Sequence, residues 1–175
     1  IIRRGDDLVQ ARRPGTRCYS RAMFVANRKA IASGRFAYLM ALYAENYWRL
    51  VGLFGPDRLV RGEYLSSVGD GIDLRVSMLE RQPYTLDLCL SYLFEDDATG
   101  RPDPSAHVRV YRDARVAEVT TCHYGSRLED LLGRHADTRT VYDHRLRMNA
   151  FLDKWLAYLG ERGHGRFTLQ PLPAA

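Results

Sequence analysis

IDLRVSMLERQPYTLDLCLSYLF, residues 72–94, alternates apolar and polar side chains in two successive runs. Because neighbouring side chains of a strand point to opposite faces of a sheet, each run predicts a strand with one apolar face. Aligning the two apolar faces pairs Met78 with Leu86 and leaves residues 81–83 as the loop. A further strand, residues 63–68, precedes this hairpin, and the Asp70-Gly71 pair between them favours a two-residue turn.

The stretch VRVYRDARVAEVT, residues 108–120, predicts two more strands. A two-residue turn at Asp113-Ala114 places Arg109 across from Glu118 and Arg112 across from Arg115, with one face of the hairpin apolar. The polar side chains form either an arginine-lined patch for an anionic or protein ligand or a solvated tip in which Asp113 bonds local backbone. The candidate binding residues are Arg109, Tyr111, Arg112, Asp113, Arg115 and Glu118.

Helical periodicity appears on both sides of these strands, over residues 36–54 and residues 143–163. Asn46 and Asn149 interrupt the leucine-rich stripes of these two helices. An unpaired buried amide costs roughly 1–3 kcal/mol, so each asparagine needs a partner. We expect the two amides to bond to each other or to exposed backbone, and the alternative is that they line a buried polar pocket. SRLE, residues 126–129, has the spacing of a capping box and predicts a short additional helix.

These patterns predict an α+β fold, in which an antiparallel β-meander of about five strands is covered on one face by an N-terminal and a C-terminal helix. We assign residues 36–165 to this domain. Residues 1–35 are expected to be a poorly ordered basic leader, and residues 166–175 a loosely ordered tail.

Positive charge is concentrated in the leader. Residues 1–35 hold nine basic and two acidic residues, whereas residues 36–175 hold 17 basic and 19 acidic residues. The domain itself therefore lacks the charge that nucleic-acid binding requires, and we expect contact with nucleic acid only through residues 1–35.

The motifs of catalysis, metal binding and membrane insertion are missing from the sequence. There is no phosphate-binding loop, nucleophile elbow or dinucleotide fingerprint, so no cofactor is expected. Cys18, Cys89 and Cys122 have neither disulfide nor zinc spacing, and the acidic residues 95–105 do not follow a calcium-loop pattern. The chain has no apolar run of membrane-spanning length and no signal-like start, so we expect a cytoplasmic protein that is not membrane-bound.

Three segments resemble one known family: LMALYAENYWRL (39–50), YRDARVAEV (111–119) and NAFLDKWLAYL (149–159), supported by ERQPYTLDL (80–88). In order and spacing they are similar to the domain of unknown function 1249 family, the YqiB-like bacterial proteins. The resemblance covers residues 39 to about 164 and implies a cytoplasmic bacterial protein without an assigned function. The resemblance implies that the following residues of this sequence correspond to the family pattern: Asn46, Tyr84, Thr85, Tyr111, Asp113, Ala114, Glu118, Asn149 and Trp155.

Besides nucleic-acid binding through residues 1–35, two functional classes remain open. The first is a non-enzymatic binding or regulatory module that holds a protein or small-ligand partner with a sheet face or the hairpin tip. The alternative is an enzyme or receptor for a small anionic metabolite, such as a nucleotide, with arginines as phosphate clamps. A concave pocket in which two or more arginines converge with an aromatic side chain would favour this alternative.

Overall fold

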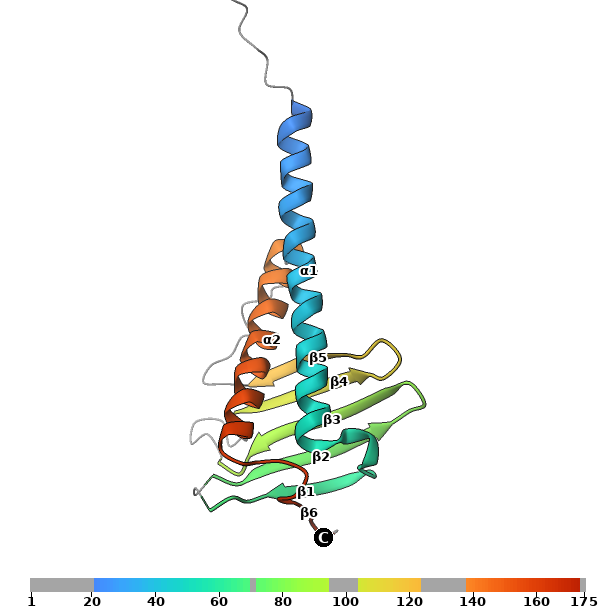
Figure 1. Ribbon diagram of the computed structural model, residues 1–175, viewed down its shortest axis with the longest axis vertical. Coiled ribbons are helices and arrows are strands. Elements are labelled where there is room, and N and C mark those ends of the chain that lie inside the picture. Colours follow the sequence, from blue (N-terminus) through green and yellow to red (C-terminus); the bar gives the residue numbers. More distant parts are fainter. Residues whose placement is uncertain (1–20, 70–71, 95–103, 124–137, 174–175) are drawn as a thin grey trace, which may run out of the picture. The chain divides into compact units, whose positions relative to one another are not determined.

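A computed structural model describes residues 21–69, 72–94, 104–123 and 138–173, with side chains described from residue 34 onward (Figure 1). Residues 36–175 form a compact unit of their own, and it is the fold of this unit that positions the candidate site. The predicted short helix at residues 126–133, the acidic residues 95–103, Asp70, Gly71 and Cys18 lie outside the described residues.

The described chain forms an α+β fold with a six-stranded antiparallel sheet in the order β5-β4-β3-β2-β1-β6. The fold class is confirmed, with six strands rather than five. In chain order the elements are α1 (Arg21–Phe54), the 3-10 helix η1 (Pro56–Arg58), β1 (Gly62–Ser66), β2 (Leu74–Arg81), β3 (Thr85–Tyr92), β4 (Ser105–Tyr111), β5 (Val116–His123), α2 (Thr138–Glu161) and β6 (Leu169–Pro171).

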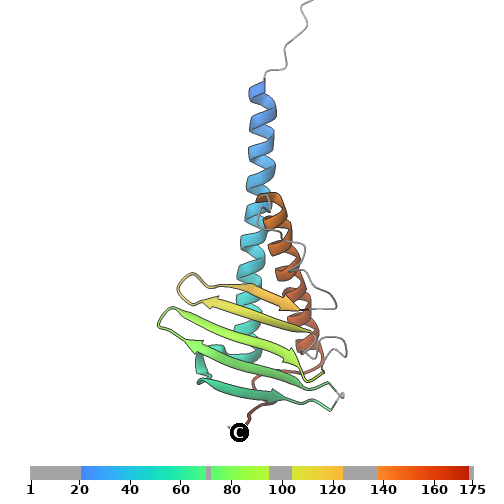
Figure 2. The same ribbon diagram turned by 180° about the vertical axis from the view of Figure 1, so that it is seen from behind.

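From Phe36 onward, α1 lies beside α2 on one face of the sheet, as the two opposite views in Figures 1 and 2 show. The core forms between these helices and the alternating apolar positions of the strands, where Leu50, Leu88 and Leu152 are almost fully buried. The predicted start of the first helix at residue 36 was wrong, because α1 begins at Arg21. Residues 21–33 contain neither glycine nor proline, so nothing in this segment breaks a helix.

The sixth strand comes from the segment that sequence analysis assigned to a loose tail, so that prediction was wrong for residues 169–171. β6 pairs antiparallel with β1, with Leu65 across from Gln170. Leu169 packs against the core, and the Thr168 hydroxyl lies 2.6 Å from the hydroxyl of buried Ser66. Apolar burial and a buried polar contact together hold this segment to the sheet.

The predicted register of the β4–β5 hairpin is confirmed, with Arg109 across from Glu118. The turn itself differs from the prediction, since it comprises four residues, Arg112–Arg115, with a left-handed φ of 53° at Arg115. A two-residue turn of type I′ requires left-handed backbone at both Asp113 and Ala114, which is costly for alanine. The longer turn keeps the same strand register and needs one left-handed residue.

The predicted register of the β2–β3 hairpin was wrong. Met78 lies across from Leu88 instead of Leu86, because β2 continues to Arg81 and a bulge follows Met78. The shift of two residues leaves every side chain on its predicted face. In the β1–β2 hairpin, Ser66 lies across from Leu74, one residue away from the register that a turn at residues 70–71 requires. Ser66 and Leu74 are both buried, so sharing the core face determines this pairing.

Candidate functional site

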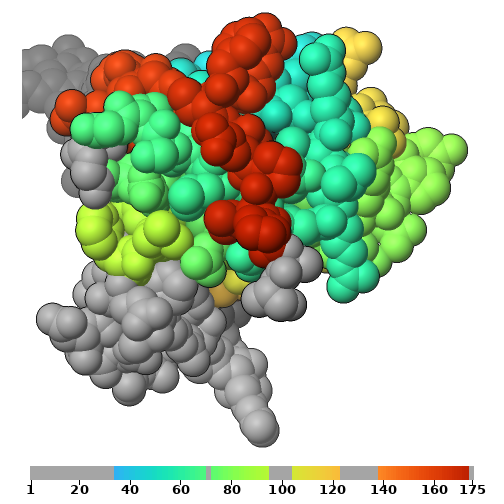
Figure 3. Space-filling model, turned by 90° about the horizontal axis from the view of Figure 1, so that it is seen from below, coloured from blue at the N-terminus to red at the C-terminus, as the bar shows by residue number. Residues whose placement is uncertain are grey.

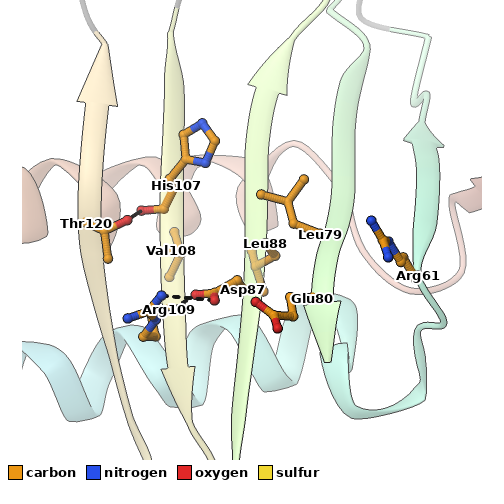
Figure 4. Close-up of a pocket in the computed structure, with 9 residues that line it drawn as sticks. All are labelled: Arg61, Leu79, Glu80, Asp87, Leu88, His107, Val108, Arg109 and Thr120. Atoms are coloured by element: carbon orange, nitrogen blue, oxygen red, sulfur yellow. Dashed lines mark hydrogen bonds and ion pairs between the residues drawn. The ribbon is translucent and has the colours of Figure 1, made fainter. Parts of the chain in front are cut away.

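The face of the sheet opposite α1 and α2, here called the outer face, carries a hollow of about 430 Å³ (Figure 4). Asp87 and Arg109 belong to the polar positions that alternate with buried core residues, so they point away from the helices. The residues that line the hollow are Arg61, Leu79, Glu80, Asp87, Leu88, His107, Val108, Arg109 and Thr120.

Two β-bulges shape this hollow. The β2–β3 register skips Leu79, and the β4–β5 register skips Thr120, so each strand carries one unpaired extra residue. Both extra residues line the hollow, one on either side of β3 and β4. Leu79 is 40% exposed, and the Thr120 hydroxyl donates to the His107 carbonyl at 3.2 Å. Bulges commonly redirect side chains beside functional sites.

Asp87 and Arg109 form a two-pronged ion pair in the hollow. Nε of Arg109 lies 2.8 Å from Oδ1 of Asp87, and Nη2 lies 3.1 Å from Oδ2. This hydrogen bonding to Asp87 raises the pKa of Arg109, so the guanidinium stays charged. The charged partner of Arg109 is therefore Asp87 on β3, although Glu118 is its cross-strand neighbour on β5.

Glu118 instead links the outer face to the helices at the β5 edge. Its Oε1 accepts a hydrogen bond of 2.8 Å from the Tyr111 hydroxyl, and its Oε2 accepts one of 2.8 Å from Nη1 of Arg145 on α2. The bond to Glu118, followed by burial, raises the pKa of Tyr111. Tyr43, on α1, interacts with both Arg145 and Glu118, and its pKa is raised mainly by burial.

Asn46 and Asn149 meet beside this edge, and both are fully buried. Nδ2 of Asn46 lies 3.4 Å from Oδ1 of Asn149 and 3.3 Å from its carbonyl oxygen. Oδ1 of Asn149 also accepts the Val119 backbone N–H of β5 at 3.0 Å, while Nδ2 donates to the Arg145 carbonyl at 2.8 Å. The expected contact between the two amides is therefore present, and Asn149 also satisfies a backbone donor of the edge strand.

The remaining predicted residues lie at the β4–β5 turn. Arg112 reaches Asp57 of η1 with an Nε–Oδ1 distance of 2.6 Å and donates from Nη1 to the Pro83 carbonyl at 2.8 Å. Oδ1 of Asp113 accepts the Ala114 backbone N–H at 2.8 Å, which is the local bond expected of a turn aspartate. The Arg115 guanidinium lies 5.9 Å from the centre of the Trp48 ring.

The predicted residues thus fall into three groups: Arg109 in the hollow, Tyr111 and Glu118 at the β5 edge, and the turn residues beside η1 and α1. Arg61 and Asp87 were not predicted for the hollow. Asp87 would have been identified from the correct β3–β4 register, because that register places it across from Arg109. Arg61 and Arg109 share the hollow, but phenylalanine, tyrosine and tryptophan are absent from its lining.

Within the described residues, no group of three histidine, cysteine or carboxylate side chains is placed to hold a metal ion. The described helices also include none with the length and apolar character needed to cross a membrane. Cys89 is a free thiol, and burial raises its pKa to about 11.

Comparison with family models matches residues 49–165 to a family described as "Protein of unknown function (DUF1249)". The matched range contains η1, strands β1 to β5 and α2, and so includes the hollow and the β4–β5 turn. Comparisons with curated proteins and with solved structures found no match.

Proposed function

We propose, from the premise that the chain belongs to the DUF1249 family of proteins of unknown function, that it is a non-enzymatic binding module. Its ligand occupies the hollow of the outer sheet face. We further propose that it acts in the bacterial cytoplasm, which the family resemblance and the free thiol of Cys89 support.

One observation carries this proposal: both bulge residues, Leu79 and Thr120, line the same hollow. A bulge interrupts the hydrogen-bond ladder of a sheet, so two of them around one hollow give that region a shape that regular strands would not have. The lining combines an exposed leucine with the Asp87–Arg109 pair, and a few placed polar groups beside apolar surface are typical of ligand pockets.

The contacts inside the hollow support binding rather than catalysis. Among the described residues, the side-chain hydrogen bonds in the hollow join Asp87 to Arg109 and Thr120 to the His107 carbonyl. A nucleophile needs a hydrogen-bonded base, which in turn needs an orienting partner. The observed bonds engage Asp87 with a cation and Thr120 with a backbone acceptor, so they do not build that arrangement.

A second candidate is a receptor for a small anionic metabolite. The presence of Arg61 and Arg109 in one hollow favours it, because guanidinium groups bind phosphate and carboxylate strongly. Asp87 already occupies the fork of Arg109, so an anion has to compete with this carboxylate. The charge of Asp87 therefore distinguishes the two candidates.

The proposal is tested by a thermal-shift screen of the full chain against inorganic phosphate, nucleotides, cyclic nucleotides, amino acids and short peptides. A ligand at 100 times its dissociation constant stabilises a protein by about 2.7 kcal/mol. We expect Thr120→Tyr, which fills the hollow, and Arg61→Glu to abolish the shift. Arg147→Glu changes an exposed arginine outside the hollow and should leave the shift unchanged.

Asp87→Asn then separates the two candidates. It removes a competing negative charge, so phosphate or nucleotide binding should tighten, whereas a ligand that uses the carboxylate should bind more weakly. If no compound stabilises the chain, or if Thr120→Tyr leaves every shift intact, the hollow is not the binding site.

A further inference from the structure

Segments that are far apart in sequence meet at one end of the sheet, here called the turn end. It comprises Trp48, residues 57–61, residues 80–84 and residues 112–115. The side chain of Arg112 links residues 112–115 to the other two loops, because it pairs with Asp57 and donates to the Pro83 carbonyl. The backbone N–H of Arg112 also donates to the Tyr84 carbonyl at 2.8 Å. Figure 3 shows the teal, light-green and yellow segments close together at this end.

Further contacts tie the turn end into one surface. Nη1 of Arg81 donates to the Leu59 carbonyl at 3.0 Å, which holds the end of β2 against the segment before β1. Arg115 lies over Trp48 of α1. The surface is therefore built on the framework of the sheet and α1.

Large apolar and aromatic side chains are exposed on this surface. Trp48 is 53% exposed, Val60 67% and Tyr84 68%. Tryptophan, tyrosine and arginine are the residues most enriched among those that dominate binding energy at protein interfaces. Single exposed apolar residues need no explanation, but three on one connected surface, interspersed with arginines, are typical of an interaction site.

Arginine pairing differs between this surface and the rest of the sheet. On the sheet outside the turn end, Arg75 and Arg109 each have a carboxylate within ion-pair distance, and at the turn end Arg112 pairs with Asp57. Four turn-end arginines have no carboxylate partner among the residues that the structure describes: Arg58, Arg61, Arg81 and Arg115. Residues 36–175 as a whole carry more acidic than basic residues, so this local excess of unneutralised guanidinium groups is not a consequence of overall composition.

We infer that the turn end binds an acidic, partly apolar peptide segment of a partner protein. The apolar side chains of the peptide pack on Trp48 and Tyr84, and its carboxylates pair with Arg58 and Arg115. Residues 1–35 of this chain are basic, so they do not supply this occupant. Asp57, Glu80 and Asp113 lie among the arginines and divide the positive charge into separate sites, which suits a peptide with spaced carboxylates better than a continuous phosphate backbone.

The test uses the full chain and a labelled peptide in which glutamate alternates with leucine and phenylalanine, with affinity measured by fluorescence anisotropy. We expect Arg58→Glu/Arg115→Glu to weaken binding at least about tenfold, and Trp48→Ala to weaken it as well. Arg147→Glu is the matched control, because Arg147 is an exposed arginine of α2 that has no ion pair with a described residue. The affinity of the Arg147→Glu variant for the peptide should equal that of the unmodified chain.

Three outcomes would overturn the inference. These are the absence of peptide binding, equal weakening by Arg147→Glu and by the turn-end double variant, and tighter binding of single-stranded RNA than of the peptide. Thr120→Tyr fills the hollow and should leave peptide binding unchanged, so failure of this inference is distinguishable from failure of the proposed function. Circular dichroism melts confirm that the variants, all at exposed positions, remain folded.

Discussion

Asn46 of α1 contacts Asn149 of α2 through an Nδ2–Oδ1 distance of 3.4 Å, and the same oxygen accepts the Val119 backbone N–H of β5. One amide oxygen therefore connects both helices to the edge of the sheet. The two asparagines are not equivalent, because Oδ1 of Asn46 is buried and has no hydrogen-bond partner in the described part of the chain. This asymmetry predicts different costs for replacing each residue.

Asn149→Leu should lower the free energy of unfolding by roughly 1–3 kcal/mol, because the Val119 N–H and the Asn46 amide lose their acceptor. Asn46→Leu should cost less, because the change also removes an unsatisfied oxygen and leaves Asn149 bonded to Val119 and Arg145. Urea unfolding of both single variants measures the difference.

The double variant Asn46→Leu/Asn149→Leu should be more stable than the sum of the single effects implies, with a coupling above about 0.5 kcal/mol. Part of the loss should remain, because Val119 still lacks its acceptor. Strictly additive effects would contradict a direct contact between the two amides.

Tyr111→Phe should flatten the loss of stability in alkali. The hydrogen bond to Glu118, followed by burial, raises the pKa of Tyr111 above its ordinary value of 10.0. A raised pKa means that the folded state holds the proton more tightly, so this stabilisation is present below pH 10 and is lost as pH rises through the folded pKa. Urea unfolding as a function of pH measures the slope.

Cys89 should react slowly with iodoacetamide in the folded protein. Burial is the main cause that raises its pKa from 9.0 to about 11, although Arg75 opposes the shift. The thiolate is the reactive form, so little of it is present in mildly alkaline solution. Mass spectrometry after timed labelling should show slow modification of Cys89 in buffer and rapid modification in urea. Equal rates in the two solutions would show that burial does not protect this thiol.

Deleting residues 169–175 should lower the melting temperature by more than about 4–8 °C, the effect of 1 kcal/mol in a small domain. The deletion removes β6 and Leu169 from the core and leaves the edge of β1 unpaired, so aggregation should also increase. Differential scanning calorimetry and light scattering measure the two effects. Gln170→Ala keeps the backbone of β6 and should have little effect, since Gln170 is exposed.

Removing residues 1–33 should lower the melting temperature by less than about 4–8 °C. Among the residues with described side chains, the buried core begins at Leu39, so this deletion should leave the core of residues 36–175 intact. A larger decrease in the calorimetric melting temperature would show that the leader stabilises the domain.

Period-two and helical patterns were sufficient to predict the α+β class, the side-chain faces of the strands and the contact between Asn46 and Asn149. The β4–β5 register was predictable because its turn joins strands directly, and both a two-residue and a four-residue turn give the same pairing. The turn conformation was not predictable from this pattern, because Arg115 adopts left-handed backbone where a non-glycine residue rarely does.

Local sequence patterns determine which face of a strand is apolar, since alternation depends on neighbouring residues alone. They do not determine the partner of a strand, because a shift of two residues preserves every face, and Met78 accordingly pairs with Leu88 instead of Leu86. Only the tertiary structure decided the pairing of β6 with β1, the choice of Asp87 as the ion-pair partner of Arg109, and the meeting of Trp48 with Arg115. These contacts form between segments that are distant in sequence. The alternation of apolar and polar residues fits several strand registers equally well, and the positions of bulges and the reach of long side chains decide which contacts form.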